Sequence, residues 1–130
     1  MGFDKKTKVK FGLIIIILLG AIFFLLINYN QTIEILYFTN PKCRLVNETD
    51  VIIQEIENDF KDKVNVRTIK VSMYPDDEPD TEEIKRLREK YEVYGVPTII
   101  INGEEFTEEF TKENLRENIC NYFMIRPKVC

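Results

Sequence analysis

"YFTNPKCRLVNET", residues 37–49, lies where two sequence patterns meet. The apolar segment 32–38 leads into it and predicts a buried or half-buried strand. From residue 44 to residue 60, apolar residues recur at the spacing of one helical face. Between the two stands one cysteine, Cys43, and the residue three positions later is Val46. The sequence therefore places a single thiol at the junction of a strand and a helix.

A second strand, a loop and a second helix are predicted next. Residues 64–73 alternate between apolar and polar side chains, as in a strand, with one interruption of the alternation. The segment 74–80 is acidic and contains two prolines, so it predicts a solvated loop. A calcium site there is disfavoured, because the segment lacks the glycine and the terminal glutamate of an EF-hand loop. Thr81 is the expected N-cap of a helix whose C-cap is Gly95.

The last part of the chain predicts a hairpin and a third helix. Residues 97–103 form a β-branched strand that ends on Asn-Gly, the dipeptide most typical of a tight hairpin turn. Residues 104–110 would return antiparallel, and residues 112–123 form an amphipathic helix. The order is β-α-β-α-β-β-α, in which the first two strands are parallel and joined by a helical crossover. The predicted fold class is α/β, a sandwich around a mixed four-stranded sheet.

Composition excludes several kinds of site. The chain has 130 residues, enough for one compact domain and an appendage. It contains no histidine, and its three cysteines lack metal-ligand spacing, so neither a metal nor a cofactor is predicted. Residues 1–30 carry four lysines and one aspartate, so of the net charge of −4 the remainder of the chain carries −7. Nucleic acid is excluded as a partner, because binding it needs clustered Lys and Arg.

The N-terminal segment predicts a membrane anchor. Residues 11–27 carry no charge, and with Asn28 and Tyr29 they approach the roughly 20 residues that span a bilayer. The alternative is a cleaved signal peptide, but its apolar region is usually only about 7–15 residues long and precedes a small-x-small site, which is missing here. Lysines precede the segment, so residues 1–10 are predicted to be cytoplasmic and the domain that follows to be extracytoplasmic. We therefore expect a single-pass signal anchor at residues 11–29 in the cell membrane.

Two tripeptides match the acceptor pattern for N-glycosylation, which fits an extracytoplasmic domain. They begin at Asn30 and at Asn47. Asn47 is the weaker candidate, because it falls at the predicted start of a helix.

Two motifs, in this order of elements, resemble the thioredoxin-like superfamily. The first is "YFTNPKCRLV", which is similar to the superfamily's active-site pattern F-x-x-P-x-C-x-x-C. Phe38, Pro41 and Cys43 match that pattern, and Val46 replaces its second cysteine.

The second motif is "YEVYGVPTIIINGEEF", residues 91–106, in which Gly-Val-Pro-Thr matches the superfamily's cis-proline segment. The resemblance covers about residues 32–124 and leaves 125–130 as a C-terminal tail. It implies that Pro97 follows a cis peptide bond and lies beside the reactive cysteine. It also implies that the backbone of Val96 is free to pair with an extended peptide.

The residues around Cys43 favour a reactive thiolate. Cys43 precedes a helix, whose N-terminal end is positive, and Lys42 and Arg44 flank it. A thiolate attacks a disulfide and forms a mixed disulfide, which a second cysteine normally resolves. Because Val46 cannot do so, a dithiol cycle within this motif is disfavoured.

Three hypotheses remain for Cys43. In the first, it is the catalytic thiol of a monothiol oxidoreductase, whose partners are protein thiols or disulfides and include a membrane redox protein. In the second, the domain is redox-inert and binds a partner protein or peptide at the face formed by Cys43 and Pro97. In the third, Cys43 is bridged to Cys120 or Cys130.

Cys120 and Cys130 also form a candidate disulfide with each other, one that would tie down the C-terminal tail. The alternative is that Cys120 is a core residue and Cys130 a frayed end. The bridge requires the two Cα atoms to lie within about 7 Å.

Overall fold

The computed structural model describes residues 5–29 and 31–130. The chain divides into two units, with the boundary between Gln31 and Thr32.

The N-terminal unit consists of one helix, α1 (Lys5–Tyr29). Its side chains from Gly12 to Ile27 are all exposed, and nearly all of them are apolar. Within the part of the chain that the structure describes, no helix meets the length and apolarity that a membrane span requires. The predicted transmembrane helix at residues 11–29 is therefore not confirmed.

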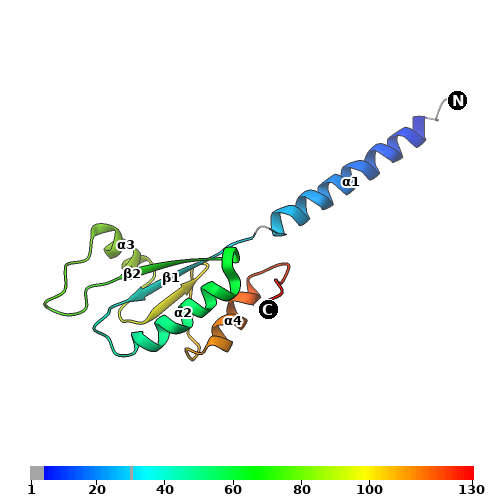
Figure 1. The fold of residues 1–130 in the computed structure, drawn as a ribbon. Helices are drawn as coiled ribbons and strands as arrows, with labels where there is room; N and C mark the ends of the chain where they lie inside the picture. The colour runs from blue at the N-terminus through cyan, green and yellow to red at the C-terminus, as the bar shows by residue number, and fades with distance from the viewer. Residues whose placement is uncertain (1–4, 30) are drawn as a thin grey trace. The chain divides into compact units, whose positions relative to one another are not determined.

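The second unit is built on the four-stranded sheet that the sequence predicts (Figure 1). Its strands are β1 (Ile33–Thr39), β2 (Val64–Lys70), β3 (Thr98–Ile101) and β4 (Glu104–Glu105). Their order across the sheet is β2-β1-β3-β4. β1 pairs parallel with β2 and antiparallel with β3, and β3 pairs antiparallel with β4, so the predicted mixed sheet is confirmed.

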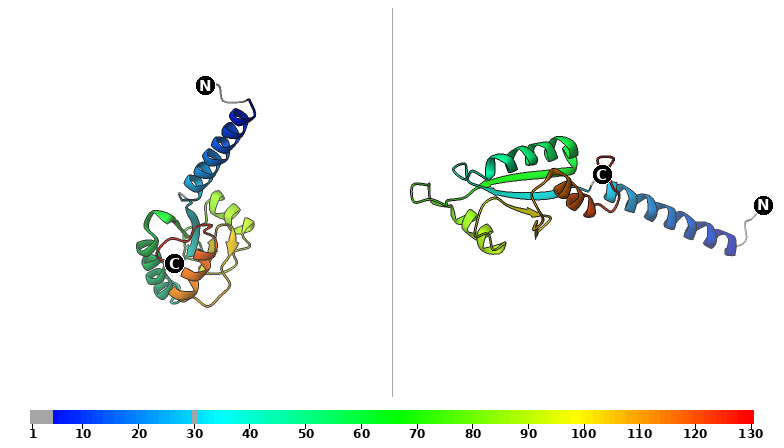
Figure 2. Two further views of the ribbon diagram at one scale, coloured as in Figure 1. Left: turned by 90° about the vertical axis from the view of Figure 1, so that its right-hand side faces the viewer. Right: turned by 90° about the horizontal axis from the view of Figure 1, so that it is seen from below.

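Helices cover both faces of the sheet, as the left view of Figure 2 shows for α2 and α3. α2 (Val46–Phe60) and α4 (Lys112–Asn121) pack against one face, and α3 (Glu82–Lys90) packs against the other. A short 3-10 turn, η1 (Lys61–Lys63), joins α2 to β2.

Two apolar cores result, because the side chains of a strand alternate between the faces of the sheet. The larger core lies under α2 and α4 and includes Tyr37 and Ile99, and the smaller one lies under α3 and includes Phe38 and Ile100. The β-branched run in β3 is buried on both faces, which explains why it is uniformly apolar rather than alternating.

Several element boundaries differ from the prediction. α3 ends at Lys90 and not at Gly95, because the chain turns at Glu92, which has a φ of 52°. That turn directs Val93 into the smaller core, where it is 4% exposed. β4 has only two residues instead of the predicted seven-residue strand.

The tight turn between β3 and β4 is confirmed. Asn102 and Gly103 both have positive φ, 50° and 92°, as a two-residue hairpin turn of this type requires. The predicted tail 125–130 belongs to the compact second unit, since Val129 packs against the larger core.

Candidate functional site

Cys43 lies in the turn between β1 and α2. Its backbone N–H donates to the carbonyl oxygen of Asn40 at 3.0 Å, and its own carbonyl accepts from the N–H of Val46 at 3.1 Å. The thiol is free and partly buried. Because α2 begins at Val46, the cysteine stands one turn before the helix rather than in its first residues.

The structure brings Cys43 next to the second sequence motif. The thiol lies 3.8 Å from the carbonyl oxygen of Val96, at the distance of a weak S–H···O hydrogen bond. The Val96–Pro97 peptide bond is cis, as the resemblance predicts. The backbone N–H of Val96 has no hydrogen-bond partner among the residues that the structure describes. Cys43, Val96 and Pro97 thus form one face at the end of the sheet.

Val46 takes the place of a second thiol and belongs to the core. Its side chain is only 1% exposed at the start of α2. The position at which the superfamily pattern has its second, resolving cysteine is therefore occupied by a buried valine side chain.

The structure shows ion pairs of Lys42 that the sequence did not indicate. Its ammonium group lies 2.8 Å from a carboxylate oxygen of Asp76 and 2.7 Å from one of Asp77. These carboxylates, that of Asp76 first, raise the pKa of Lys42. The positive charge expected to stabilise a Cys43 thiolate is therefore paired with the acidic segment 74–80.

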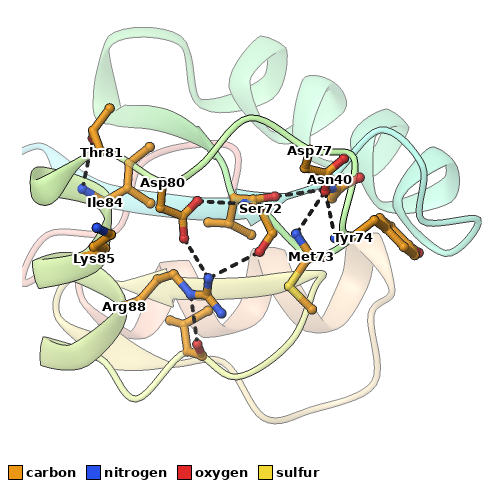
Figure 3. Close-up of polar contacts among 12 residues, drawn as sticks. Asn40, Ser72, Met73, Tyr74, Asp77, Asp80, Thr81, Ile84, Lys85 and Arg88 are labelled. Carbon is orange, nitrogen blue, oxygen red and sulfur yellow. Dashed lines mark hydrogen bonds and ion pairs between the residues drawn. The ribbon is translucent and has the colours of Figure 1, made fainter.

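That acidic segment is anchored at two points rather than freely solvated, as Figure 3 shows. Asp77 accepts hydrogen bonds from the side-chain amide of Asn40 at 2.7 Å and from the backbone N–H groups of Met73 and Tyr74 at 2.9 Å each. At the other end, Asp80 accepts from the backbone of Ser72 at 2.6 Å.

Asp80 also forms an ion pair with Arg88 of α3, at 2.6 Å. Sequence reasoning missed both anchors, because they depend on tertiary contacts. The available signal was the aspartates themselves, which often accept hydrogen bonds from nearby backbone groups in turns.

The Lys42 ammonium, more than any other group, holds the pKa of Asp77 well below its usual range. The hydrogen bonds from the Met73 and Tyr74 backbone act in the same direction. Asp77 therefore carries its negative charge throughout the neutral range.

A cavity of about 260 Å³ lies between the turn before Cys43 and the acidic segment. Asn40 and Pro41 line one side, and Glu78 and Ile84 are among the residues opposite. Within the described part of the chain, no group of acidic or cysteine side chains could hold a metal ion.

A partly buried polar pair lies beside the start of α2. The hydroxyl group of Tyr37 donates to a carboxylate oxygen of Asp50 at 2.6 Å. Burial, followed by this hydrogen bond, raises the pKa of Tyr37 well above its usual value. The Thr39 hydroxyl, on the same strand, is buried and has no hydrogen-bond partner among the residues described here. This pair was not predicted from the sequence, because nothing in the spacing of residues 37 and 50 shows that they meet.

Cys120 and Cys130 form a disulfide, with their Cα atoms 5.8 Å apart. Cys43 is left free, so the hypothesis that it is bridged to either of them is contradicted. The reason is distance within the fold, because α2 begins at the end of the domain away from the C-terminus (Figure 1).

The two candidate glycosylation residues differ in what the structure says of them. Asn30 lies outside the described residues. Asn47 is exposed in the first turn of α2, but Thr49 of its tripeptide is 3% exposed and donates to the carbonyl of Leu45.

Comparison with known proteins places the fold. No family model and no curated protein matches the chain. A solved structure of a malarial protein is 15% identical, with a TM-score of 0.52, over 73% of this chain and all of that one. A point mutant of thioredoxin from Halobacterium salinarum is 19% identical, with a TM-score of 0.54, over 75% of this chain and 80% of that one.

The fold is thioredoxin-like. Thioredoxin from Wuchereria bancrofti aligns over 62% of this chain and 69% of that one, at 22% identity and a TM-score of 0.48. At these identities the likeness concerns the fold, and the chemistry has to be argued from the residues of the site.

Proposed function

We propose that the thioredoxin-like domain carries out thiol–disulfide exchange through Cys43 alone. The observation that carries this proposal is the free, partly exposed thiol of Cys43, held in a hydrogen-bonded turn against the carbonyl of Val96. A buried structural cysteine would be enclosed by apolar side chains, whereas this one faces a backbone segment.

The exchange proceeds in two steps. The thiolate of Cys43 attacks one sulfur of a substrate disulfide, so that a bond forms between them and the second substrate sulfur leaves as a thiolate and takes up a proton. Because Val46 has no thiol, an external thiol must attack the mixed disulfide. That attack releases Cys43, and the external thiol ends up in a disulfide with the substrate.

The backbone of Val96 supports an extended protein segment as the substrate. Its N–H group has no partner among the described residues, so an incoming strand could accept from it. Main-chain pairing of this kind gives affinity without demanding a particular sequence.

We also propose that α1 anchors the domain at a membrane, with the N-terminus in the cytoplasm. The apolar side chains of α1 are exposed, and four lysines precede residue 11. The disulfide between Cys120 and Cys130 supports an oxidising, extracytoplasmic location for the domain.

The exchange proposal is tested with the full-length protein and a model disulfide such as oxidised glutathione. Mass spectrometry should find one adduct, on Cys43, in the wild type and none in Cys43→Ser. An unreactive Cys43 in folded wild-type protein at neutral pH would overturn the proposal.

The location is tested with a membrane-impermeant maleimide on intact cells. Labelling of Cys43 in intact cells is expected, and the Cys43→Ser variant is the control. If labelling appears only after lysis, the domain lies inside the cell.

The second candidate function is a redox-inert module that binds a partner at the same face. It is favoured by exposed apolar side chains on the segments that form the site. Leu45 is 67% exposed and Tyr94 is 84% exposed. Under this hypothesis, chemical cross-linking in cells captures the same partner with wild type and with Cys43→Ser, whereas Leu45→Glu abolishes the capture.

A further inference from the structure

The acidic segment 74–80 is connected to the turn that carries Cys43 through one residue, Asp77. One of its carboxylate oxygens accepts from the side chain of Asn40 at 2.7 Å, and the other lies 2.7 Å from the ammonium group of Lys42. The Asp77 side chain is 11% exposed and that of Lys42 is 43% exposed, so the contact with the buried Asn40 is the better shielded of the two. No other acidic residue of the segment contacts both Asn40 and Lys42 among the contacts that the structure describes.

Asn40 transmits this restraint to Cys43. It is 3% exposed, and its side-chain amide also donates to the carbonyl of Val71 at 2.8 Å. Its side-chain oxygen accepts from the backbone N–H of Lys42 at 2.9 Å, and its carbonyl accepts from the N–H of Cys43 at 3.0 Å. The Asn40 amide nitrogen thus binds Val71 and Asp77, while its side-chain oxygen and its backbone carbonyl hold Lys42 and Cys43.

The same contacts determine where the charge of Lys42 lies. Asp76 and Asp77 together hold its ammonium group, so the three side chains carry a net charge of −1 where the sequence alone places a positive charge next to Cys43. A thiolate is favoured by a nearby unpaired cation and disfavoured by nearby negative charge. Lys42 directly precedes Cys43 in the sequence, but because its charge is paired it does not act on the thiol as an unpaired cation.

We propose that Asp77 is a positioning residue that restrains the reactivity of Cys43, by fixing its turn through Asn40 and by keeping the charge of Lys42 paired. This inference concerns the site of the proposed exchange reaction, but it requires only that Cys43 react with small reagents. A partner that brings a basic group to Asp76 and Asp77 would release Lys42 and activate the thiol.

The test measures the rate at which iodoacetamide, a neutral reagent, alkylates Cys43 in the full-length protein at pH 7. Cys120 and Cys130 do not react while they are paired. Asp77→Asn is expected to raise the rate about threefold or more, because one negative charge is lost and Lys42 keeps only its ion pair with the exposed Asp76. The difference from wild type should shrink in about 1 M KCl, which screens charges beyond roughly 3 Å.

Asp80→Asn is the matched control. Asp80 anchors the other end of the same segment through Ser72 and Arg88 and does not contact the turn before Cys43 in the contacts described. Its substitution should change the alkylation rate by less than about twofold. An equal effect of Asp77→Asn and Asp80→Asn would show general loosening of the segment and overturn the proposal.

A double-mutant cycle with Lys42→Met separates the weaker pairing of Lys42 from simple loss of negative charge at Asp77. In the Lys42→Met background, Asp77→Asn should raise the rate much less than in the wild type. Equal increases in the two backgrounds, or no increase in either, would contradict the proposal.

If Asp77→Asn does not fold, Asp76→Asn replaces it, because Asp76 is 79% exposed and contacts Lys42 without contacting Asn40 in the described structure. A rise in rate, smaller than threefold, is then expected, and an unchanged rate would count against the restraint. Failure of the proposed function is a separate result, namely a wild-type Cys43 that is alkylated but forms no mixed disulfide.

Discussion

The thiol of Cys43 lies 3.8 Å from the carbonyl oxygen of Val96, 53 residues further along the chain. β1 and β3 produce this contact, because they pair antiparallel with Phe38 opposite Thr98. The turn that follows β1 and the bend that precedes β3 therefore meet at the same end of the sheet. The candidate site is a consequence of that register.

Replacing Val46 by cysteine should give the domain an internal resolving thiol. Val46 stands three residues after Cys43, and its N–H is hydrogen-bonded to the carbonyl of Cys43, so the two side chains start from one helical turn. We expect Val46→Cys to catalyse reduction of insulin by dithiothreitol at least about tenfold faster than wild type, since an internal thiol has a high effective concentration.

The control for this prediction is Val46→Cys combined with Cys43→Ser, which keeps the new thiol and removes the nucleophile. It should be inactive. If Val46→Cys and wild type have the same rate, the lack of a second thiol is not what limits turnover.

Removing the bridge between Cys120 and Cys130 should destabilise the domain. The bridge closes a loop over a sequence separation of 10 and holds Val129 against the larger core. In the chain-entropy model a loop of this size contributes roughly 2–3 kcal/mol. Urea unfolding of the Cys120→Ala/Cys130→Ala double variant measures this loss, and wild type kept reduced with dithiothreitol should unfold at a similar urea concentration. An unchanged midpoint in both would show that the bridge contributes nothing.

Tyr37→Phe should lower the free energy of unfolding by about 1–2 kcal/mol. The Tyr37 side chain is 1% exposed, and its hydroxyl is hydrogen-bonded to Asp50 at 2.6 Å. The substitution keeps the ring and leaves the carboxylate without this donor. Asp50→Asn retains an acceptor oxygen, so in the same urea titration it should lower the free energy of unfolding by less than Tyr37→Phe does. A larger decrease for Asp50→Asn would show that another contact of Asp50 provides the stability.

Acid should destabilise the wild type more than Asp77→Asn. The pKa of Asp77 is lowered from its ordinary value of 3.8, chiefly by Lys42, so the folded state binds a proton less readily than the unfolded chain does. The stability linked to this group is fully present above the ordinary value and is lost as the pH falls below it toward the folded-state pKa.

Urea midpoints measured between pH 6 and about pH 2 should therefore converge for the two proteins as the pH falls. Asp80→Asn provides a comparison for the general effect of removing one carboxylate. Parallel pH curves for wild type and Asp77→Asn would contradict this assignment.

Local sequence patterns predicted most of the elements correctly. The apolar run in β1, the β-branched run in β3 and the turn at Asn102–Gly103 could each be predicted from a single segment. Thr81 also caps α3 as expected, since its hydroxyl accepts from the N–H of Ile84. The predicted end of α3 at Gly95 was wrong, because burial of Val93 in the smaller core outweighed the preference of glycine for a helix end.

The site could be predicted only in part. The sequence alone indicated Cys43 as the thiol, Val46 as the missing second thiol, and a nearby proline segment by resemblance. It did not indicate that Asp77 holds both Asn40 and Lys42, since these contacts join residues more than 30 positions apart. Neighbouring charges in the sequence suggested that Lys42 would act on Cys43, whereas its nearest carboxylates in space belong to another segment.

What the sequence by itself determined is the identity of most elements of the second unit and the single thiol between a strand and a helix, because periodicity, capping and turn propensity are local properties. Only the tertiary structure decided which charges surround that thiol. The parallel pairing of β1 with β2 brings the segment after β2 next to the turn after β1. Side chains there pair according to distance in space, and sequence spacing does not contain that distance.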